Sequence, residues 1–278
     1  MNKVHVGPAN LGGYAEDRLA GGSAMNIKVD GYEIDILVTG FPGKSVYHAT
    51  LGWSTVALFR GAGRTLLIDG GSIAMRRMLM AKMTEKGIAP SGVTHMLITH
   101  AHHDHLINWT LFRNARIVIG ALELEHAAKA AWGETSYPEL YVRELQKWPT
   151  LQTVNDGEEF LPGITAHLAP GHTPGHLVFV LHGAERDVIF TGDAAKNRTE
   201  LVCGKTDMTY DHAVSAASVA LVWKLWRARP GNILIPGHDL PMVLEQGKCR
   251  YLGQRQAAIT AWYGDDLETV TRFELTAK

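Results

Sequence analysis

Histidine and aspartate cluster directly after one short apolar segment of the chain. The sequence HAHHDH follows the apolar residues 96–98. Side chains two positions apart at the end of a β-strand point the same way, so His100 and His102 can share one target. Asp104 and His105 follow in the turn and can aim beside them. Neutral imidazole and carboxylate suit Zn²⁺ and similar divalent ions, so this spacing predicts a metal site.

Three further motifs place histidine or aspartate after an apolar segment and a glycine turn. They are PGHTPGH at 170–176, TGDA at 191–194 and PGHD at 236–239. Each alone is compatible with an ordinary loop. Strand ends meet at one rim of a sheet, however, and ligands delivered from them converge easily. Four such motifs in one chain therefore favour a single metal site built from several strand ends.

The elements that must carry these motifs alternate between strands and helices. A hairpin is expected from strands Thr55–Phe59 and Thr65–Asp69 around a turn at Gly61–Gly63. Helical text covers 72–86, 121–132, 138–148 and 212–229, with a further helical stretch near 247–263. Other strands are expected within 26–40, 95–100, 116–120, 151–154, 164–169, 177–183, 187–193 and 232–238. This order predicts an α/β fold with mixed sheets.

Composition limits the class of protein. The 278 residues are 46% hydrophobic, enough for one sizeable domain, which we place at 25–278 behind a loosely attached arm at 1–24. The 27 Lys and Arg against 28 Asp and Glu leave a net charge of −1, which argues against nucleic-acid or membrane partners. Neither an export signal nor a membrane-spanning apolar run is expected. With two cysteines only, Cys203 and Cys249, a cytoplasmic protein is predicted, and a homodimer is left open.

Five motifs in order are similar to those of a known family. LLIDGG at 66–71, then HAHHDH, PGHTPGH, TGDA and PGHD, resemble the metallo-β-lactamase-fold metal-dependent hydrolase superfamily, in its lactonase and glyoxalase II-like branch. The resemblance runs from about Thr55 to His238. It implies a four-layer αββα sandwich with mixed β-sheets and a two-metal site at one rim of the paired sheets.

The resemblance also implies a role for each motif residue. The first metal would be held by His100, His102 and His172, the second by Asp104, His105 and His238, and Asp193 would bridge the two. Asp69 would support the site by holding a ligand imidazole, although a turn residue before Gly70-Gly71 is the alternative. His103 and His176 are not expected to be ligands. Two divalent ions per chain are implied, zinc first, with iron, manganese and cobalt as alternatives.

Such a site implies a hydrolytic reaction. Two divalent ions about 3.5–4 Å apart lower the pKa of a shared water toward neutrality, and the resulting hydroxide would attack a carbonyl carbon. Asp104 and Asp193 are the candidates for handling the proton. We therefore predict a dinuclear metal-dependent hydrolase of a small lactone or carboxylic ester. A glyoxalase II-type thioesterase is the alternative, β-lactam ring opening is third, and a non-enzymatic binding protein is last.

Substrate choice depends on residues outside the ligand motifs. The PGHD ending, in place of PGHE, favours the lactonase-like and esterase branches over glyoxalase II. Homoserine lactonases usually carry a tyrosine three residues after the bridging aspartate, where this chain has Lys196. This lysine could act in catalysis by binding a substrate carboxylate or an oxyanion, or be a solvated loop residue. A glutathione thioesterase would need a basic helical C-terminal region, for which Lys248, Arg250 and Arg255 are candidates. Trp53, Trp109 and Tyr47 are candidates for an apolar pocket wall.

Overall fold

The computed structural model describes residues 25–29, 31–133, 136–266 and 269–276. The predicted arm at 1–24 lies outside the described residues. Within the part that is described, no helix combines the length and apolar character needed to cross a membrane.

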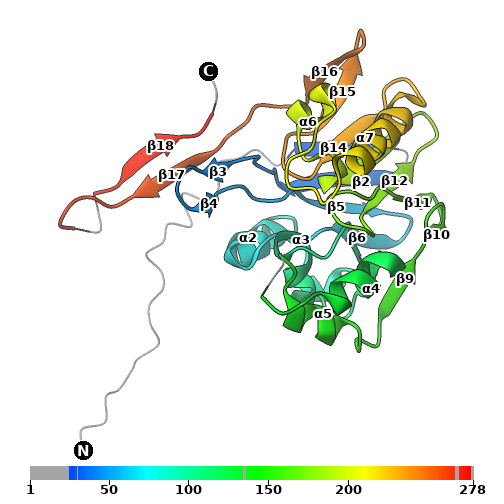
Figure 1. The fold of residues 1–278 in the computed structure, drawn as a ribbon, viewed down its shortest axis with the longest axis horizontal. Coiled ribbons are helices and arrows are strands. Elements are labelled where there is room, and N and C mark those ends of the chain that lie inside the picture. Colours follow the sequence, from blue (N-terminus) through cyan, green and yellow to red (C-terminus); the bar gives the residue numbers. More distant parts are fainter. Residues whose placement is uncertain (1–24, 30, 134–135, 267–268, 277–278) are drawn as a thin grey trace, which may run out of the picture.

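Two seven-stranded sheets form the centre of the structure (Figure 1). The first has the order β1-β2-β5-β6-β7-β8-β9. Strands β1, β2, β5 and β6 pair antiparallel, and β6 to β9 pair parallel. Their bounds are β1 (Met25–Val29), β2 (Tyr32–Val38), β5 (Val56–Gly61), β6 (Arg64–Ile68), β7 (His95–Ile98), β8 (Arg116–Gly120) and β9 (Leu151–Val154).

The second sheet has the order β10-β11-β12-β13-β14-β15-β16. Only the central pair β13 and β14 is parallel, and all other neighbours run antiparallel. The bounds are β10 (Glu159–Leu161), β11 (Ile164–Leu168), β12 (Leu177–His182), β13 (Asp187–Gly192), β14 (Ile233–Pro236), β15 (Met242–Glu245) and β16 (Lys248–Tyr251). Both sheets are thus mixed, as predicted.

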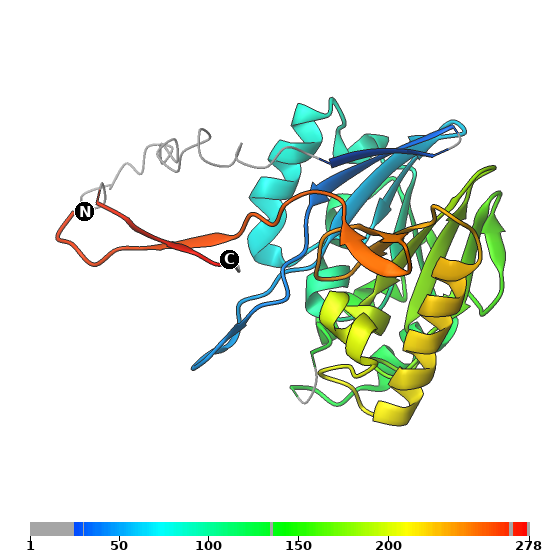
Figure 2. The same cartoon turned by 90° about the horizontal axis from the view of Figure 1, so that it is seen from above.

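Helices cover the outer face of each sheet, so the layers run α, β, β, α (Figures 1 and 2). The first sheet carries α2 (Arg76–Glu85), α3 (His103–Leu106), α4 (Ala121–Lys129) and α5 (Glu139–Leu145), and the second carries α6 (Arg198–Cys203) and α7 (His212–Arg227). Short 3₁₀ turns are η1 (Ile73–Met75), η2 (Pro90–Gly92), η3 (Ile107–Leu111) and η4 (Asp193–Ala195). The αββα sandwich expected from the sequence is confirmed.

Three apolar clusters hold these layers together. One lies between the sheets, where the rings of Phe59 and Phe190 stack with centroids 5.7 Å apart. The other two lie under the helices of each outer layer. Strand β7 serves two clusters at once, because Leu97 faces the opposite sheet while Met96 and Ile98 face the helices. This explains why its sequence is apolar without alternation, as in buried parallel strands.

The predicted helix near 247–263 is wrong. The chain forms β16 there and then β17 (Ala258–Ala261), which pairs with β18 (Thr271–Glu274). In β16 the burial alternates, with Cys249 and Tyr251 packed against the core under α7 and their neighbours exposed. Alternating side-chain direction is typical of a strand. Packing against the core therefore outweighs the helical pattern of the sequence.

Two hairpins extend away from the sandwich. They are β3 (Lys44–Ser45) with β4 (Ala49–Thr50), and β17 with β18 (Figure 2). Neither sequence segment was recognised as a projecting hairpin from the sequence alone.

Candidate metal centre

The seven predicted ligands converge at one rim of the paired sheets. They lie in the loops that follow β7, β11, β13 and β14. Ligands thus come from both sheets, His100 to His105 from the first and the others from the second. The motif loops meet because the ends of these four strands point to the same rim.

The first group consists of imidazoles only. The ligand atoms of His100, His102 and His172 lie within 4.8 Å of one another. Nδ1 of His102 is 2.9 Å from Nε2 of His172. Nε2 of His100 is buried and has no hydrogen-bond partner among the residues that the structure describes. A buried acceptor nitrogen without a partner costs free energy unless a cation meets it, so this group fits a divalent metal.

The second group combines two imidazoles with a carboxylate. Nε2 of His105 lies 3.4 Å from Nε2 of His238, and Oδ2 of Asp104 lies 3.4 Å from the same His238 nitrogen. Asp104 and His105 share the first turn of α3, where Leu106 and its neighbours anchor the helix in the core. This donor set also fits a divalent ion.

Asp193 lies between the two groups. Its Oδ2 is 3.3 Å from Nε2 of His172, and its Oδ1 is 3.3 Å from Nε2 of both His105 and His238. The carboxylate therefore faces one group with each oxygen. The family resemblance implies a bridging position for Asp193, and its placement is compatible with that role.

The ring nitrogens that face away from the centre have partners that orient the imidazoles. Nδ1 of His105 lies 2.8 Å from Oδ2 of Asp69, and Nδ1 of His172 lies 2.8 Å from the carbonyl oxygen of Met208. Asp69 also accepts hydrogen bonds from Thr99, at its backbone nitrogen (2.9 Å) and its hydroxyl. Fixing one ring nitrogen presents the other to a metal. The carboxylate of Asp69 is thus within hydrogen-bond distance of a predicted ligand, a placement compatible with a supporting role.

The two histidines that are not expected to be ligands, His103 and His176, belong to neither ligand group. His103 is exposed at the start of α3. His176 is buried, and its Nε2 accepts a hydrogen bond from the backbone nitrogen of Asp193 at 2.9 Å. Gly192 adopts a φ of +48°, and a Cβ there would lie 2.7 Å from that imidazole. The turn that delivers Asp193 therefore requires glycine and is held by His176.

Electrostatics differ between the two groups. Burial lowers the pKa of His100 and His172 well below the usual value and that of His102 to about 4, so these rings are neutral. Around His105 and His238 burial acts in the same direction, but the carboxylates of Asp104 and Asp193 outweigh it and raise both pKa values. The pKa of Asp193 lies well below its usual range, because the surrounding imidazoles outweigh its burial.

Lys196 lies close to the ligands but bonds within the protein. Its Nζ is 2.9 Å from Oε1 of the buried Glu200 and donates to the carbonyl oxygen of Asp207. The Asp207 carboxylate in turn pairs with Lys44 of β3, which joins the projecting hairpin to this loop. The ammonium group therefore already has a carboxylate partner, and a contact with substrate would have to compete with it.

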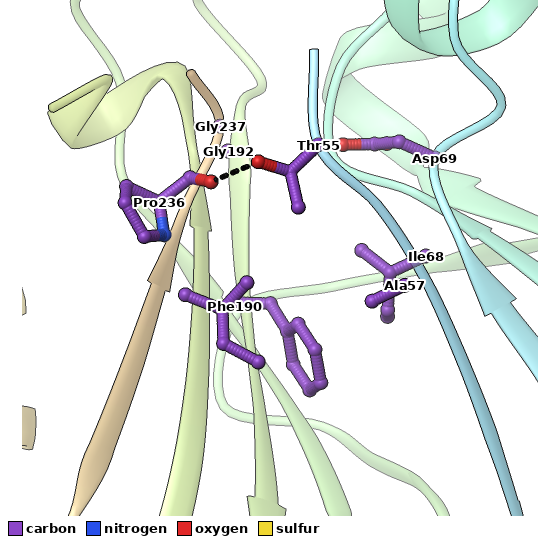
Figure 3. Close-up of a pocket in the computed structure, with 9 residues that line it drawn as sticks. Thr55, Ala57, Ile68, Asp69, Phe190, Gly192, Pro236 and Gly237 are labelled. Atoms are coloured by element: carbon purple, nitrogen blue, oxygen red, sulfur yellow. Dashed lines mark hydrogen bonds between the residues drawn. The ribbon is translucent and has the colours of Figure 1, made fainter. Parts of the chain in front are cut away.

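A small cavity lies where the sheets meet beside the ligand loops (Figure 3). Its volume is about 10 Å³, room for about one water molecule. At its edge the hydroxyl of Thr55 donates a hydrogen bond to the carbonyl oxygen of Pro236 at 2.7 Å. The backbone nitrogen of Thr55 donates a second hydrogen bond to the carbonyl oxygen of Gly237. Thr55 therefore fixes the first sheet to the segment that presents His238.

Several residues considered for the pocket have other surroundings. Trp109 is buried in the core, with its ring centroid 4.9 Å from that of Trp148. Trp53 stacks on Phe41, and Tyr47 is 89% exposed at the end of the β3–β4 hairpin. Trp109 therefore does not line a pocket wall. The aromatic ring beside His102 is that of Tyr137, which the sequence patterns did not indicate. The centroids of the two rings are 5.2 Å apart.

The basic residues considered for a glutathione grip are on a strand and the loop after it. Arg250 pairs with Glu245 in the neighbouring strand at 2.6 Å. Arg255 pairs with the buried Asp239, which also accepts a hydrogen bond from the Tyr251 hydroxyl at 2.9 Å. The aspartate of PGHD is thus paired with residues of the C-terminal region.

The fold and the site together define a class, namely αββα proteins with two His/Asp groups at one rim that share an aspartate. The sequence model of the metallo-beta-lactamase superfamily matches residues 49–238, and the chain belongs to this superfamily.

Known proteins similar to this chain share that assignment. Metallo-beta-lactamase domain-containing protein 1 of Xenopus laevis is 30% identical over 227 residues, which cover 81% of this chain and 84% of the relative. The N-acyl homoserine lactonase of Bacillus cereus is 24% identical over 241 residues, 80% of this chain and 85% of that protein. Among solved structures, AidC, a dizinc quorum-quenching lactonase in complex with a product, is similar with a TM-score of 0.63. That comparison covers 84% of this chain and 98% of AidC at 16% identity, a likeness in fold alone.

Proposed function

We propose that this protein is a dinuclear metal-dependent hydrolase that opens a small lactone or cleaves a small carboxylic ester. The observation that carries the proposal is the position of Asp193, with one carboxylate oxygen toward each of two groups of ligand-type side chains. A single structural metal would need one closed set of four ligands. Two adjoining sets that share a carboxylate are instead typical of two-metal hydrolytic sites.

In this proposal each group holds one ion, zinc first. His100, His102 and His172 bind one, Asp104, His105 and His238 bind the other, and Asp193 contacts both. Two bound divalent ions would supply a water of lowered pKa and a Lewis acid for the carbonyl oxygen. Asp104 is the carboxylate that would receive the proton released by this water, because its side chain is 20% exposed, whereas that of Asp193 is 5% exposed. His105 and His238 hold the pKa of Asp104 below the usual value against the effect of burial, so the carboxyl group is ionised.

A lactone or ester is preferred to a glutathione thioester because of the C-terminal region. Residues 248–251 form a strand rather than a helix, and Arg250 and Arg255 are paired with acidic residues of this chain. A ligand carboxylate would have to break those pairs. The similar Bacillus cereus protein is an N-acyl homoserine lactonase, which supports lactone ring opening as the first reaction to test.

Lys196 distinguishes this chain within that class. It stands where homoserine lactonases usually carry a tyrosine. Its side chain is 12% exposed, and its ammonium group is paired with Glu200. We therefore place other small lactones and esters ahead of acyl-homoserine lactones. An acidic substrate could draw on the charge of Lys196, which lies near enough to His172 to lower its pKa further.

The test is acid release measured by pH-stat on the purified protein. Lactones, esters, thioesters and β-lactams are each supplied with and without a metal chelator, and bound metal is counted in parallel. Because each hydrolysis liberates a proton, the readout assumes no particular substrate. Chelator-sensitive release on lactones or esters, with about two ions per chain, is expected.

Two results would overturn the proposal. Release confined to thioesters would establish the glyoxalase II-type alternative. A protein that releases no acid from any substrate and takes up no divalent ion would be a binding protein of this fold. Asp193→Asn is the matched control, since it removes one negative charge at nearly unchanged volume and should abolish release on any true substrate.

A further inference from the structure

A buried carboxyl group lies between the two loops that form the first ligand group. Glu123 occupies the first turn of α4 and is 0% exposed. It is not among the predicted ligands, and the reaction proposed above does not use it. Buried carboxyl groups are costly unless they are hydrogen-bonded, so its retention at this place calls for a role.

Each oxygen of Glu123 serves a different ligand loop. Oε1 accepts a hydrogen bond from the backbone nitrogen of Ala101 at 2.8 Å, between His100 and His102. Oε2 accepts from the hydroxyl of Thr173 at 2.7 Å and from the backbone nitrogen of Gly175 at 3.1 Å. One side chain thus joins the loop after β7, in the first sheet, to the loop after β11, in the second.

Close backbone packing brings that second loop to the carboxyl group. A Cβ at Gly175 would lie 2.0 Å from the backbone nitrogen of Glu123. Only glycine allows the loop to approach the start of α4 so closely. Thr173, adjacent to His172, is 1% exposed and donates its hydroxyl to the same carboxyl group. The contact is therefore specific for this loop conformation.

We propose that Glu123 is a positioning residue for the first metal, which sets the separation of His102 and His172. The inference rests on the proposed dinuclear site and adds the residue that aligns one half of it. The role parallels that of Asp69, which bonds to His105 of the second group. Asp69 acts on the imidazole itself, whereas Glu123 acts through the backbone of Ala101 and Gly175 and the hydroxyl of Thr173.

The experiment measures metal affinity rather than turnover. Wild-type protein, Glu123→Ala and Glu123→Gln are stripped, reloaded with Zn²⁺ and titrated against a chromogenic chelator, and Co²⁺-loaded samples give the ligand-field spectrum. Glu125→Gln is the matched control, because Glu125 is on the same helix but is exposed and pairs with Lys129. Partners that orient metal ligands typically change affinity by about 10–100-fold.

The expected result is a selective loss. Glu123→Ala should weaken one of the two Zn²⁺ affinities about 10–100-fold and alter one component of the Co²⁺ spectrum, while the other affinity and Glu125→Gln stay unchanged. Glu123→Gln should restore part of the loss, because its carbonyl oxygen can still accept from Ala101. If Glu123→Ala does not fold, Thr173→Val, which removes a single donor, should still show a smaller loss at the same ion.

Two outcomes would contradict the inference. Variants with lower thermal stability but wild-type affinity for both ions would show that Glu123 only supports the fold. Equal weakening of both ions would show that it does not act on one group. A wild-type protein that binds fewer than two ions would instead overturn the dinuclear site itself.

Discussion

The two ligand groups differ in charge more than in arrangement. The first, with His100, His102 and His172, has imidazoles that burial keeps neutral. The second has the Asp104 carboxylate beside imidazoles whose pKa values are raised. In the proposed site, an ion in the first group would meet neutral imidazoles and one oxygen of Asp193, and an ion in the second group would also meet the Asp104 carboxylate. The two neighbouring groups would therefore compensate the charge of a bound cation to different degrees.

The supports of the two groups differ as well. Asp69 contacts His105 directly, whereas Glu123 holds the first group through two loops. Direct support joins the ends of two neighbouring strands of one sheet, β6 and β7, whereas indirect support depends on the contact between α4 and the loop of the opposite sheet. Substitutions at each support therefore separate the groups experimentally.

The largest effect is expected from the residue that both groups share. Asp193→Ala should lower kcat/KM at least about a thousandfold, because loss of Lewis-acid stabilisation removes several kcal/mol from the transition state. Steady-state rates on the best substrate, with metal content by atomic absorption, measure this. Turnover retained in both Asp193→Ala and His102→Ala would remove the metal assignment.

Asp69→Ala should act mainly on the second group, because Asp69 contacts His105 directly and reaches the first group only through Thr99. We expect one Zn²⁺ affinity to fall by about 10–100-fold, because His105 loses the acceptor that orients its ring. Chelator competition measures the affinities. Asp69→Ala should weaken the ion of the second group, whereas Glu123→Ala should weaken the ion of the first. Identical Co²⁺ spectra for the two variants would show that the two supports do not act on separate groups.

Gly175→Ala tests the indirect support by overpacking. The added methyl group would meet the backbone of Glu123, and we expect unfolding free energy to fall by about 2 kcal/mol. Urea unfolding followed by circular dichroism measures this. Gly92→Ala is the control, since nothing lies within 4 Å of a Cβ there. Equal stabilities of the two variants would show that the loop can move away from α4.

The support of the first group should also respond to pH. Burial raises the pKa of Glu123 from 4.5 to about 7, although its three hydrogen bonds act against the shift. A raised pKa means that the folded protein binds more protons than the unfolded chain between these values, so this stability contribution is complete below about pH 4.5 and is lost as pH rises through about 7. Glu123→Gln removes the titration. The difference in unfolding free energy between wild type and variant should therefore change between pH 5 and pH 8, and a constant difference would contradict the shift.

The smallest effect is expected at Lys196, which belongs to neither group. Lys196→Ala should raise KM for acidic substrates more than for neutral ones, by about fivefold at most, because the ammonium group is already paired with Glu200. Matched acidic and neutral esters measure the ratio. Equal changes for both would leave Lys196 only its contacts with Glu200 and Asp207.

The ligand positions were predictable because each is local in sequence. An apolar strand, a glycine turn and a histidine can be read within nine residues, as at 164–172. The layers followed from the family resemblance. The residues that support the ligands were harder to predict. Asp69 is indicated by the motif LLIDGG, but Glu123 lies in a segment with helical periodicity, between two leucines. A charged residue in the first turn of a helix is usually solvated, and nothing local indicates a contact with residues 50 positions away.

In the C-terminal region the local sequence pattern predicts the wrong secondary structure. Residues 247–263 have a pattern that favours a helix, but Cys249 and Tyr251 pack against the core in the edge strand of the second sheet. Asp239 was interpreted as a marker of substrate branch, whereas it is buried beneath Tyr251 and Arg255. These contacts depend on which strand lies at the sheet edge, which short-range patterns do not encode.

The hydrogen bond from Thr55 to the carbonyl oxygen of Pro236 spans 181 positions in the sequence. During synthesis, the first sheet and four of the ligands leave the ribosome long before β14 exists. The first group also needs His172 of the second sheet, and the second group needs His238, which follows β14. In the proposed dinuclear site, the second group would therefore be completed last during synthesis, once His238 has emerged and Thr55 has bonded to the segment that presents it.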